Sequence, residues 1–401
     1  MNKYLSKRAK SLSPSLTLAI AAKAKKLASE GIKVINFSVG EPDFNTPEFI
    51  VESANKAMQA GKTKYTAASG IIELKKAVSA KLKADNNLDY APNQIVVSNG
   101  AKQSLHNAIQ VLVDDGDEVI IPAPYWLTYP ELVRISGGIP VCVMGEKKND
   151  YKLTPQELKK AITKKTKVLI LNSPSNPMGT LYTESEIKAL AEVIEKHDLF
   201  VISDEIYDEL LYDGHTHYSI VEYSEKLREK TILINGFSKS YAMTGWRIGY
   251  TASNKTIADA MDSLQSHTTS NPNTIAQWAS VEALMNPKGK EFLSFMRETF
   301  DERRKFMVEL FSKMPFISIV PPTSAFYVMV DVSKLFGKKS NGVELKSAHQ
   351  ISEILLDNCN IATVPGEAFG ADNFIRFSYS LSKEDIEVGL SSFSEFLENI
   401  K

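Results

Sequence analysis

The sequence has few cysteines and histidines and almost no net charge. Its 401 residues include 2 cysteines and 6 histidines, and the formal net charge is −1 at pH 7. Cys142 and Cys359 lie far apart and in no Cys-x-x-Cys or metal-ligand spacing, so we expect two inert, buried thiols in a reducing compartment. The sequence therefore predicts a cytoplasmic protein without a metal site.

Neither an excess of basic residues nor a long apolar run is present. Lys and Arg total 47 against 48 Asp and Glu, without a long run of like charges, so we expect no nucleic-acid or membrane partner. No apolar run reaches the roughly 20 residues of a membrane span. The run from Leu16 to Ala22 contains Thr17 and stops at Lys23, which favours an amphipathic helix over a signal peptide.

The middle of the chain alternates short apolar runs with helical patterns. With 43% apolar residues, the chain is long enough for a large domain and a smaller one, each with its own core. The alternation predicts an α/β fold with a mostly parallel sheet covered by helices on both faces. The runs are QIVVSNG, DEVIIPAP, IPVCVMG, KVLILNSP, LFVISDEIY, TILINGFS and RIGYTAS.

The last third of the chain changes character. After Pro287 a long helical pattern bears one apolar stripe, and mixed strand and helix patterns follow it. We predict a large domain over residues 48–290 and a smaller α+β domain built from residues 1–47 and 291–401, with a cleft between them. The stripe consists of Phe292, Met296, Phe300, Met307, Leu310 and Met314.

Unusual polar and aromatic residues follow the predicted strands. In parallel α/β sheets, ligands collect at the carboxyl ends of the strands. Asn99-Gly100 ends one strand before a helix, so its backbone N–H groups and the helix dipole offer an anion seat. Each feature alone also fits an ordinary turn, a packed aromatic ring or an exposed loop. The other strand ends supply Trp126, Asn172, Asn176, Asp204, Glu205, Tyr207, Ser238 and Lys239.

Lys239 lies in GFSKSYAMTGWRIGY, directly after an apolar strand. Burial lowers the pKa of a lysine and favours nucleophilic amine chemistry, although a surface lysine fits the same spacing. Eight residues later comes Arg247, and we expect Gly245 to permit the turn between them. A lysine, an acid, a phenol, an amide, an aromatic plate and an anion seat with an arginine together meet the needs of pyridoxal phosphate.

The motifs and their order resemble the fold-type I, class I aminotransferases, and within them the prokaryotic subgroup of bacterial aspartate aminotransferases. The resemblance covers nearly the whole chain. It rests on FSVGEPDFNTPEFI, KYTAASGIIELKKA, SNGAKQSL, PAPYWLTYPE, NSPSNPMGT, SDEIYDEL, GFSKSYAMTGWRIGY, VPGEAFG and IRFSYS.

The resemblance implies a role for each matching position. Lys239 would carry the cofactor as a Schiff base and then move the substrate proton, and Asp204 would pair with the ring nitrogen. Tyr207 and Asn176 would bond the ring oxygen, and Trp126 would stack on the ring. The implied reaction moves an amino group from an amino acid to a 2-oxo acid in two half-reactions.

Phosphate and substrate binding follow in the same way. The implied phosphate cradle comprises Gly100, Ala101, Ser238 and Arg247. Tyr65 would reach the phosphate of a neighbouring subunit, which implies a homodimer with shared active sites. Arg376 would grip the substrate α-carboxylate, closed over by the Gly40 backbone.

The distal carboxylate of the substrate is recognised differently among the proteins that the chain resembles. Other aspartate aminotransferases read it with an arginine from the partner subunit, at the position where this chain has Ser266. In the prokaryotic subgroup a lysine is thought to take over, and Lys102 matches it, although a solvated lysine in a first helical turn fits as well. Relatives that also use prephenate carry a lysine where this chain has Ser13.

We therefore predict an aspartate:2-oxoglutarate aminotransferase. An aromatic, alanine or broad-specificity aminotransferase, or a bifunctional aspartate/prephenate enzyme, stays open as an alternative. A lyase or cyclopropane-forming synthase on the same fold and the sensing half of a transcription regulator are further classes. His215 and His217 lie in a turn-like stretch, for which we expect loop polarity and no metal binding.

Overall fold

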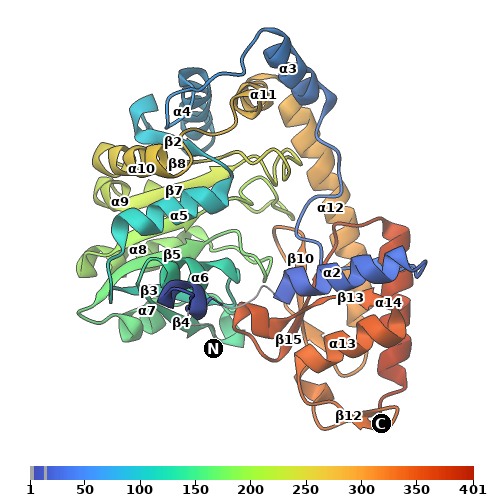
Figure 1. The fold of residues 1–401 in the computed structure, drawn as a ribbon. Helices are drawn as coiled ribbons and strands as arrows, with labels where there is room; N and C mark the ends of the chain where they lie inside the picture. The colour runs from blue at the N-terminus through green and yellow to red at the C-terminus, as the bar shows by residue number, and fades with distance from the viewer. Residues whose placement is uncertain (1–3, 13–15) are drawn as a thin grey trace.

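A computed structural model describes residues 4–12 and 16–401 (Figure 1). Its larger sheet has seven strands in the order β2-β8-β7-β6-β5-β3-β4. Each of the seven apolar runs forms one of them. The strands are β2 (Ile95–Ser98), β3 (Glu118–Ala123), β4 (Ile139–Met144), β5 (Thr166–Asn172), β6 (Phe200–Asp204), β7 (Thr231–Gly236) and β8 (Gly249–Ala252).

The large sheet is mostly parallel, as predicted. Neighbouring strands from β4 through β7 pair in parallel, and β8 runs antiparallel to both β7 and β2. Alternate residues enter different cores: Ile121 packs on one face of the sheet and Ile120 on the other. Strands buried on both faces read as continuous apolar runs, which is why the sequence pattern was informative here.

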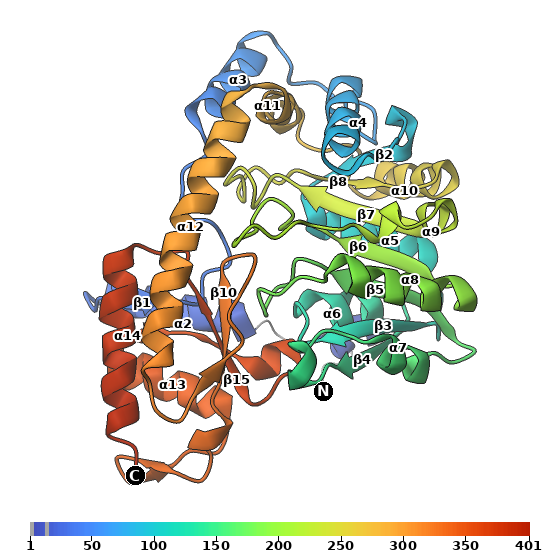
Figure 2. The same ribbon diagram turned by 180° about the vertical axis from the view of Figure 1, so that it is seen from behind.

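Helices cover both faces of this sheet (Figures 1 and 2). Residues of α5, α6 and α10 pack in the core of one face, and residues of α4, α7, α8 and α9 in the core of the other. Helices α3 and α11 pack together at the β2 end of the sheet. Their bounds are α3 (Glu48–Gln59), α4 (Ile72–Asn86), α5 (Ala101–Leu112), α6 (Thr128–Ile135), α7 (Pro155–Ala161), α8 (Glu184–His197), α9 (Glu225–Lys230), α10 (Lys255–Thr268) and α11 (Thr274–Met285).

A second group of elements joins the two ends of the chain. Ile35 of β1 pairs in parallel with Ile361 of β13, and Ala24 of α2 packs in a small core with Leu356 and Ala362. The second sheet has the order β14-β15-β10-β9. The elements are α1 (Lys7–Ser11), α2 (Leu16–Ser29), β1 (Ile35–Asn36), β9 (Ser318–Ile319), β10 (Tyr327–Asp331), β11 (Lys339–Ser340), β12 (Val343–Glu344), α13 (Ala348–Cys359), β13 (Ile361–Ala362), β14 (Val364–Pro365), β15 (Phe374–Ser378) and α14 (Lys383–Glu398).

Helix α12 (Lys288–Ser312) runs from α11 to the second sheet (Figure 2). Its predicted stripe is correct at Met296, Phe300 and Met307, which are buried. Phe292, Leu310 and Met314 are half-buried and pack against the same core, and Met314 lies just beyond the end of the helix. Leu293 and Phe311, which were not in the predicted stripe, are buried as well, where α11 and α14 contact the helix. The domain boundaries at residues 48 and 290 stay a prediction.

Both cysteines are free thiols, but the expected burial is wrong. Cys142 is exposed because it lies on β4, the edge strand of the large sheet, and Cys359 is half-buried at the end of α13. Among the described helices, none combines the length and apolar character that crossing a membrane requires.

Candidate functional site

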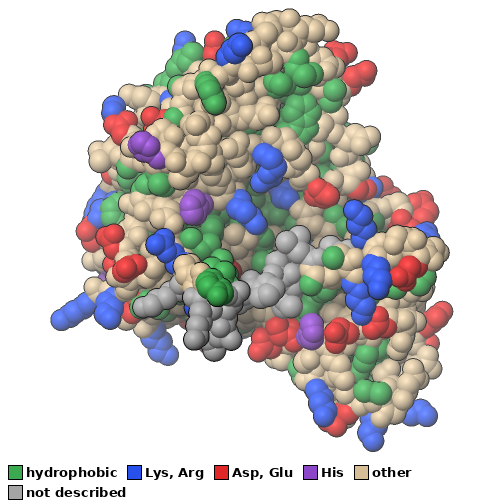
Figure 3. Space-filling view, viewed as in Figure 1, with side chains coloured by type: hydrophobic (Ala, Val, Ile, Leu, Met, Phe, Trp, Pro, Cys, Tyr) green, Lys and Arg blue, Asp and Glu red, His purple; other side chains and the backbone are tan. Residues whose placement is uncertain are grey.

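A cavity of about 510 Å³ lies where the strand ends of the large sheet face β1, β10 and β15. This volume falls within the usual range for small-molecule pockets. Figure 3 shows basic side chains around a hollow in the middle of this face. The predicted residues that line the cavity are Gly40, Ala101, Lys102, Trp126, Asn176, Asp204, Tyr207, Ser238, Lys239, Arg247 and Arg376.

Lys239 follows β7 and directs its ammonium group into the cavity. Its Nζ donates a hydrogen bond to the carbonyl oxygen of Gly40, which belongs to the N-terminal part of the chain. Burial lowers the pKa of Lys239 to about 8, and the nearby Arg376 and Arg247 add to that effect while Glu41 opposes it. At neutral pH, the neutral amine is therefore a much larger fraction of Lys239 than of a solvated lysine.

Asp204 is the last residue of β6 and is 3% exposed. Burial raises the pKa of Asp204 to about 6, whereas hydrogen bonds from the Tyr129 hydroxyl at 2.7 Å and from the Ile206 backbone at 3.3 Å act in the opposite direction. No cation lies within ion-pair distance of Asp204 among the described residues. A positively charged group in the cavity would therefore gain strongly from this carboxylate.

Tyr207 and Asn176 are linked by contacts that run through Tyr327 and Arg376. The Tyr207 hydroxyl is 3.0 Å from the Tyr327 hydroxyl, and the ring of Tyr327 lies 4.4 Å from the Arg376 guanidinium. Arg376 Nη1 donates to Asn176 Oδ1 at 3.0 Å, which leaves the Asn176 amide nitrogen without a partner in the part of the chain described. Burial raises the pKa of Tyr207, so its hydroxyl stays protonated and can donate.

Arg376 is a buried cation that has no carboxylate partner among the described residues. It lies on β15, is 2% exposed and donates to Asn176 and to the Ser38 carbonyl oxygen at 3.1 Å. Its Nε has no hydrogen-bond partner, and burial lowers the pKa of Arg376. Burying an unpaired charge costs free energy, so this guanidinium would gain from an anion bound in the cavity.

The predicted anion seat lies at the start of α5. Gly100 is the N-cap residue, with φ 83° and ψ 158°, a conformation almost confined to glycine. A Cβ at Gly100 would lie 2.6 Å from Arg247 Nη2, so the missing side chain lets the guanidinium approach the helix N-terminus. Ala101, Ser238 and Arg247 all line the adjacent cavity, and backbone N–H groups there suit a phosphate.

The turn expected at Gly245 is present. Thr244, Gly245 and Trp246 form it, and the φ of Gly245 is not left-handed. Arg247 itself has φ 58°, and its Nη1 donates to the Thr244 carbonyl oxygen at 2.8 Å. The residue with the unusual φ is therefore the predicted phosphate-binding arginine, and the turn before it holds its side chain.

Lys102 also faces the cavity, with its Nζ 4.8 Å from the centre of the Trp126 ring. Burial lowers the pKa of Lys102, and the nearby Arg247 contributes to the shift. The structure thus brings a second cation into the same cavity as Arg376, and in the part of the chain that is described neither has a carboxylate partner.

Three predicted residues are not among those that line this cavity: Gly100, which precedes the lining residue Ala101, and Tyr65 and Ser266. Tyr65 is 89% exposed, and Ser266 is an exposed residue of α10 whose hydroxyl donates to the Ser263 carbonyl oxygen at 2.7 Å. Their predicted roles depend on a partner subunit and stay predictions. Ser13 lies outside the described residues.

The residues fit pyridoxal phosphate by their chemistry. An unpaired carboxylate suits its ring nitrogen, a phenol and an amide suit its ring oxygen, and a lysine of lowered pKa suits its aldehyde. The seat between Gly100 and Arg247 suits its phosphate. Among the described residues no group of three or more His, Cys, Asp and Glu is arranged to hold a metal ion.

The sequence analysis missed several residues of the site. Tyr129 lies on α6, three residues after Trp126, a helical spacing that could have placed it on the same side. Tyr327 reads as one more core residue of an apolar strand, and nothing in the sequence singles it out. Glu41, which accepts a hydrogen bond from the Thr244 hydroxyl at 2.6 Å, lies in a recognised motif but was given no role.

The chain is similar to known proteins over most of its length. The profile of the family "Aminotransferase class I and II" matches residues 32–393. The aspartate aminotransferase of Bacillus sp. (strain YM-2) is 45% identical over 398 residues, covering 99% of this chain and 100% of that protein. The probable aspartate/prephenate aminotransferase of Aquifex aeolicus is 44% identical over 100% of both chains. The crystal structure of the aspartate aminotransferase from Rhizobium meliloti superposes with a TM-score of 0.96 at 37% identity, covering 100% of both chains.

Proposed function

The chain belongs to the class I and II aminotransferases, and we propose on that premise that it transfers the amino group of L-aspartate to 2-oxoglutarate, giving oxaloacetate and L-glutamate. As a member of this family it is a transferase that uses pyridoxal phosphate and acts on amino acids and 2-oxo acids. The observation that carries the proposal is the pair of cations in one cavity, Arg376 and Lys102, neither of which has a carboxylate partner among the described residues.

Two cations suit a substrate with two carboxylates. The buried Arg376 has an unpartnered Nε and a planar guanidinium, which bind the α-carboxylate as a fork. Lys102 lies over Trp126 and binds the distal carboxylate that aspartate, glutamate and their oxo acids share. Relatives with 45% and 44% identity bear the name of aspartate, which supports the same specificity.

The cofactor-binding residues prepare the site for proton transfer. When bound, pyridoxal phosphate accepts electrons from the substrate Cα and holds the amino group between the two half-reactions. Asp204 holds the ring nitrogen, Tyr207 and Asn176 hold the ring oxygen, and the seat at Gly100 and Arg247 holds the phosphate.

Lys239 moves the proton. Its pKa of about 8 leaves a useful fraction of free amine near neutral pH, so its Nζ takes the proton from the substrate Cα. The buried position keeps water from competing for that proton. Gly40, whose carbonyl oxygen accepts from Lys239 Nζ, closes the substrate side of the cavity.

We further infer a homodimer with shared active sites. The exposed Tyr65 reaches the phosphate of the partner, and Ser266 faces the distal carboxylate from the other subunit. Large exposed apolar residues on α3, α11 and α12, namely Met58, Met285 and Phe295, support a partner on that side. Sedimentation analysis tests this: a monomer at micromolar concentration with full activity contradicts it.

The free thiols Cys142 and Cys359 support a reducing compartment, and we propose the cytoplasm. We also propose that residues 48–290 form the large cofactor domain and that residues 1–47 with 291–401 form the small one.

The test of the function has two parts. First, borohydride reduction of the protein with pyridoxal phosphate, followed by peptide mapping, must place the cofactor on Lys239 and must fail in Lys239→Ala. Second, a screen of amino donors against 2-oxoglutarate must give the highest kcat/KM with aspartate. Equal turnover of alanine or phenylalanine contradicts the aspartate assignment, and turnover of prephenate as acceptor identifies the bifunctional alternative that the Aquifex aeolicus relative suggests.

A further inference from the structure

Strand β6 ends at Asp204, and Glu205 follows it directly, so two buried carboxylates are consecutive in the chain. Asp204 and Glu205 are 3% and 2% exposed. Successive side chains of a strand point to opposite faces, and only Asp204 lines the cavity. Two adjacent negative charges in a buried place repel each other, and after burial itself the Glu205 charge is a further cause that raises the pKa of Asp204.

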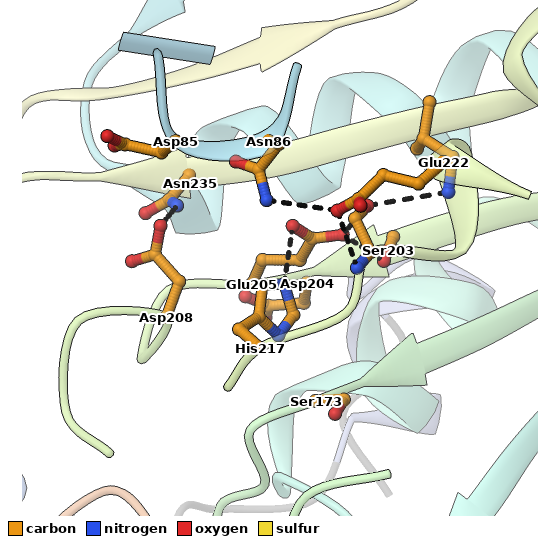
Figure 4. Close-up of polar contacts among 12 residues, drawn as sticks. Asp85, Asn86, Ser173, Ser203, Asp204, Glu205, Asp208, His217, Glu222 and Asn235 are labelled. Atoms are coloured by element: carbon orange, nitrogen blue, oxygen red, sulfur yellow. Dashed lines mark hydrogen bonds and ion pairs between the residues drawn. The ribbon is translucent and has the colours of Figure 1, made fainter. Parts of the chain in front are cut away.

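Glu205 is held by three side-chain donors on the far side of the strand (Figure 4). Its Oε1 accepts from the Ser203 hydroxyl at 2.8 Å and from the Ser219 hydroxyl at 2.5 Å, and its Oε2 accepts from His217 Nε2 at 2.8 Å. The His217 and Glu205 side chains are 8% and 3% exposed. Of the three donors, only the imidazole can carry a charge that cancels that of the carboxylate.

The other ionisable groups near this pair have partners of their own. Asp208 pairs with Lys81 at 3.0 Å and accepts from Asn235 Nδ2 at 2.8 Å. Glu222, in the 3₁₀ turn Ile220–Glu222, accepts from Asn86 Nδ2 and from the Ser219 backbone, both at 3.1 Å.

Tyr90 also faces Glu205, and burial raises the pKa of Tyr90, so its hydroxyl stays neutral. On the cavity side, Asp204 faces Tyr129 and Lys239. His217 is thus the one cation in contact with Glu205 among the described residues.

We propose that His217 is a positioning residue, which acts as an imidazolium to neutralise Glu205 and so keeps the neighbouring Asp204 ionised for the ring nitrogen of pyridoxal phosphate. The inference rests on the proposed function, because only a cofactor with a basic ring nitrogen needs the Asp204 charge. Burial alone would lower the pKa of His217, but the Glu205 carboxylate, with smaller contributions from Asp208 and Glu222, raises it above the usual value.

The test is the dissociation constant of pyridoxal phosphate from the cofactor-free full chain, measured by fluorescence between pH 6 and pH 8.5. His217→Gln keeps a donor but removes the charge. If the pKa of Asp204 rises by about one unit from its value of about 6, affinity falls about fivefold at pH 6 and is unchanged at pH 8.5. The matched control is His215→Gln, since His215 is an exposed histidine of the same loop, and it leaves affinity unchanged at both pH values.

Replacement of Glu205 is expected not to weaken the affinity for pyridoxal phosphate. Glu205→Gln removes the repulsion at Asp204, so affinity at pH 6 equals or exceeds that of the parent. The double variant E205Q/H217Q stays within about twofold of the parent. A loss in E205Q similar to that in H217Q overturns the proposal, because a purely structural pair would suffer from either change. If H217Q does not fold, E205Q and the double variant must both keep the parent affinity at pH 6, and a loss in either overturns it.

A carbocyclic analogue of the cofactor, with carbon in place of the ring nitrogen, separates charge from packing. Binding of the analogue does not respond to H217Q if the effect passes through Asp204, and an equal loss for cofactor and analogue overturns the proposal. Failure of the proposed function looks different: the parent protein itself then shows no borohydride-trapped cofactor at Lys239, whatever residue stands at position 217.

Discussion

The Tyr129 hydroxyl donates a 2.7 Å hydrogen bond to Asp204 Oδ2, and both side chains are buried. The donor favours the ionised form of a carboxylate whose pKa burial raises to about 6. The ring of Tyr129 also meets Trp126 edge-on, with 5.5 Å between the ring centres. One residue of α6 thus supports both the acid and the aromatic plate of the site.

Tyr129→Phe removes that donor, so the pKa of Asp204 rises further. In the cofactor-free protein we expect a loss of about 1.5–3 kcal/mol in the free energy of unfolding at pH 8, where Asp204 is ionised. At pH 5, where its carboxyl is mostly protonated, the loss is about 1 kcal/mol. Urea unfolding at the two pH values measures this, and an equal loss at both contradicts the assigned contact.

Asp204→Asn stabilises the cofactor-free protein at neutral pH. The pKa of Asp204 is raised from 3.8 to about 6, so its ionisation weakens the folded state as the pH rises through that window. The difference corresponds to roughly 3 kcal/mol. Urea unfolding is expected to show D204N more stable than the parent by that order at pH 8 and equal to it at pH 3.5, with cofactor binding weakened. A D204N protein that is less stable at pH 8 contradicts this.

Arg376→Met removes the buried cation that we propose binds the substrate α-carboxylate. Truncation of one partner of a buried charge pair costs about 2–5 kcal/mol of binding, so kcat/KM falls by roughly 30- to 5,000-fold for every amino acid. The melting temperature of the substrate-free enzyme changes little, because removal of an unpaired buried charge offsets the loss of its hydrogen bonds to Asn176 and to the Ser38 carbonyl oxygen. The surface variant Arg134→Met serves as a control for steady-state kinetics, and a loss confined to dicarboxylic substrates would reassign Arg376.

Lys102→Ala tests whether Lys102 binds the distal carboxylate of the substrate. We expect kcat/KM for aspartate and glutamate to fall at least tenfold, because an ion pair that is partly shielded from water in the cavity contributes more than a fully exposed one. The kcat/KM for alanine stays within about twofold, because alanine has no distal carboxylate. Lys288→Ala, at the exposed start of α12, is the matched control and changes neither. Equal losses for one- and two-carboxylate donors would remove the role of Lys102.

Gly100→Ala tests the phosphate seat. A Cβ there would lie 2.6 Å from Arg247 Nη2, whereas one at Gly116, which also has positive φ, meets nothing within 4 Å. Both variants lose about 1–3 kcal/mol of stability from backbone strain. Only G100A weakens the binding of pyridoxal phosphate, by about tenfold or more in a fluorescence titration. A similar loss of affinity in G116A would mean that strain, and not Arg247, is responsible.

Much of the fold could be predicted because its signals are local. Each of the seven apolar runs of the large sheet became a strand. In the inner strands this follows from burial on both faces, which demands continuous apolar residues, whereas the edge strand β4 is apolar but partly exposed. The long pattern after Pro287 became one helix with its apolar stripe on the core, whereas the burial of Leu293 and Phe311 depends on contacts with α11 and α14. The exposure of Cys142 was missed for a similar reason, since strand order alone places β4 at the sheet edge.

The gathering of the polar side chains from the strand ends in one place could also be predicted, because parallel strands bring their carboxyl ends to one edge. Lys239, Asp204, Tyr207 and Asn176 all reach the cavity. Tyr65 and Ser266 do not, and nothing within one subunit tests their roles.

The chain's own order of residues determines which strands form, which side chains follow them and thus which cofactor chemistry is available. Those properties depend on neighbours within a few residues. The partners of these side chains are set by folding, because they come from distant segments: Tyr129 meets Asp204 across 75 positions, and Tyr327 meets Tyr207 across 120. The contact of His217 with Glu205 spans only 12 positions, yet it too needed the fold, since burial turns a polar loop residue into the partner of a buried carboxylate.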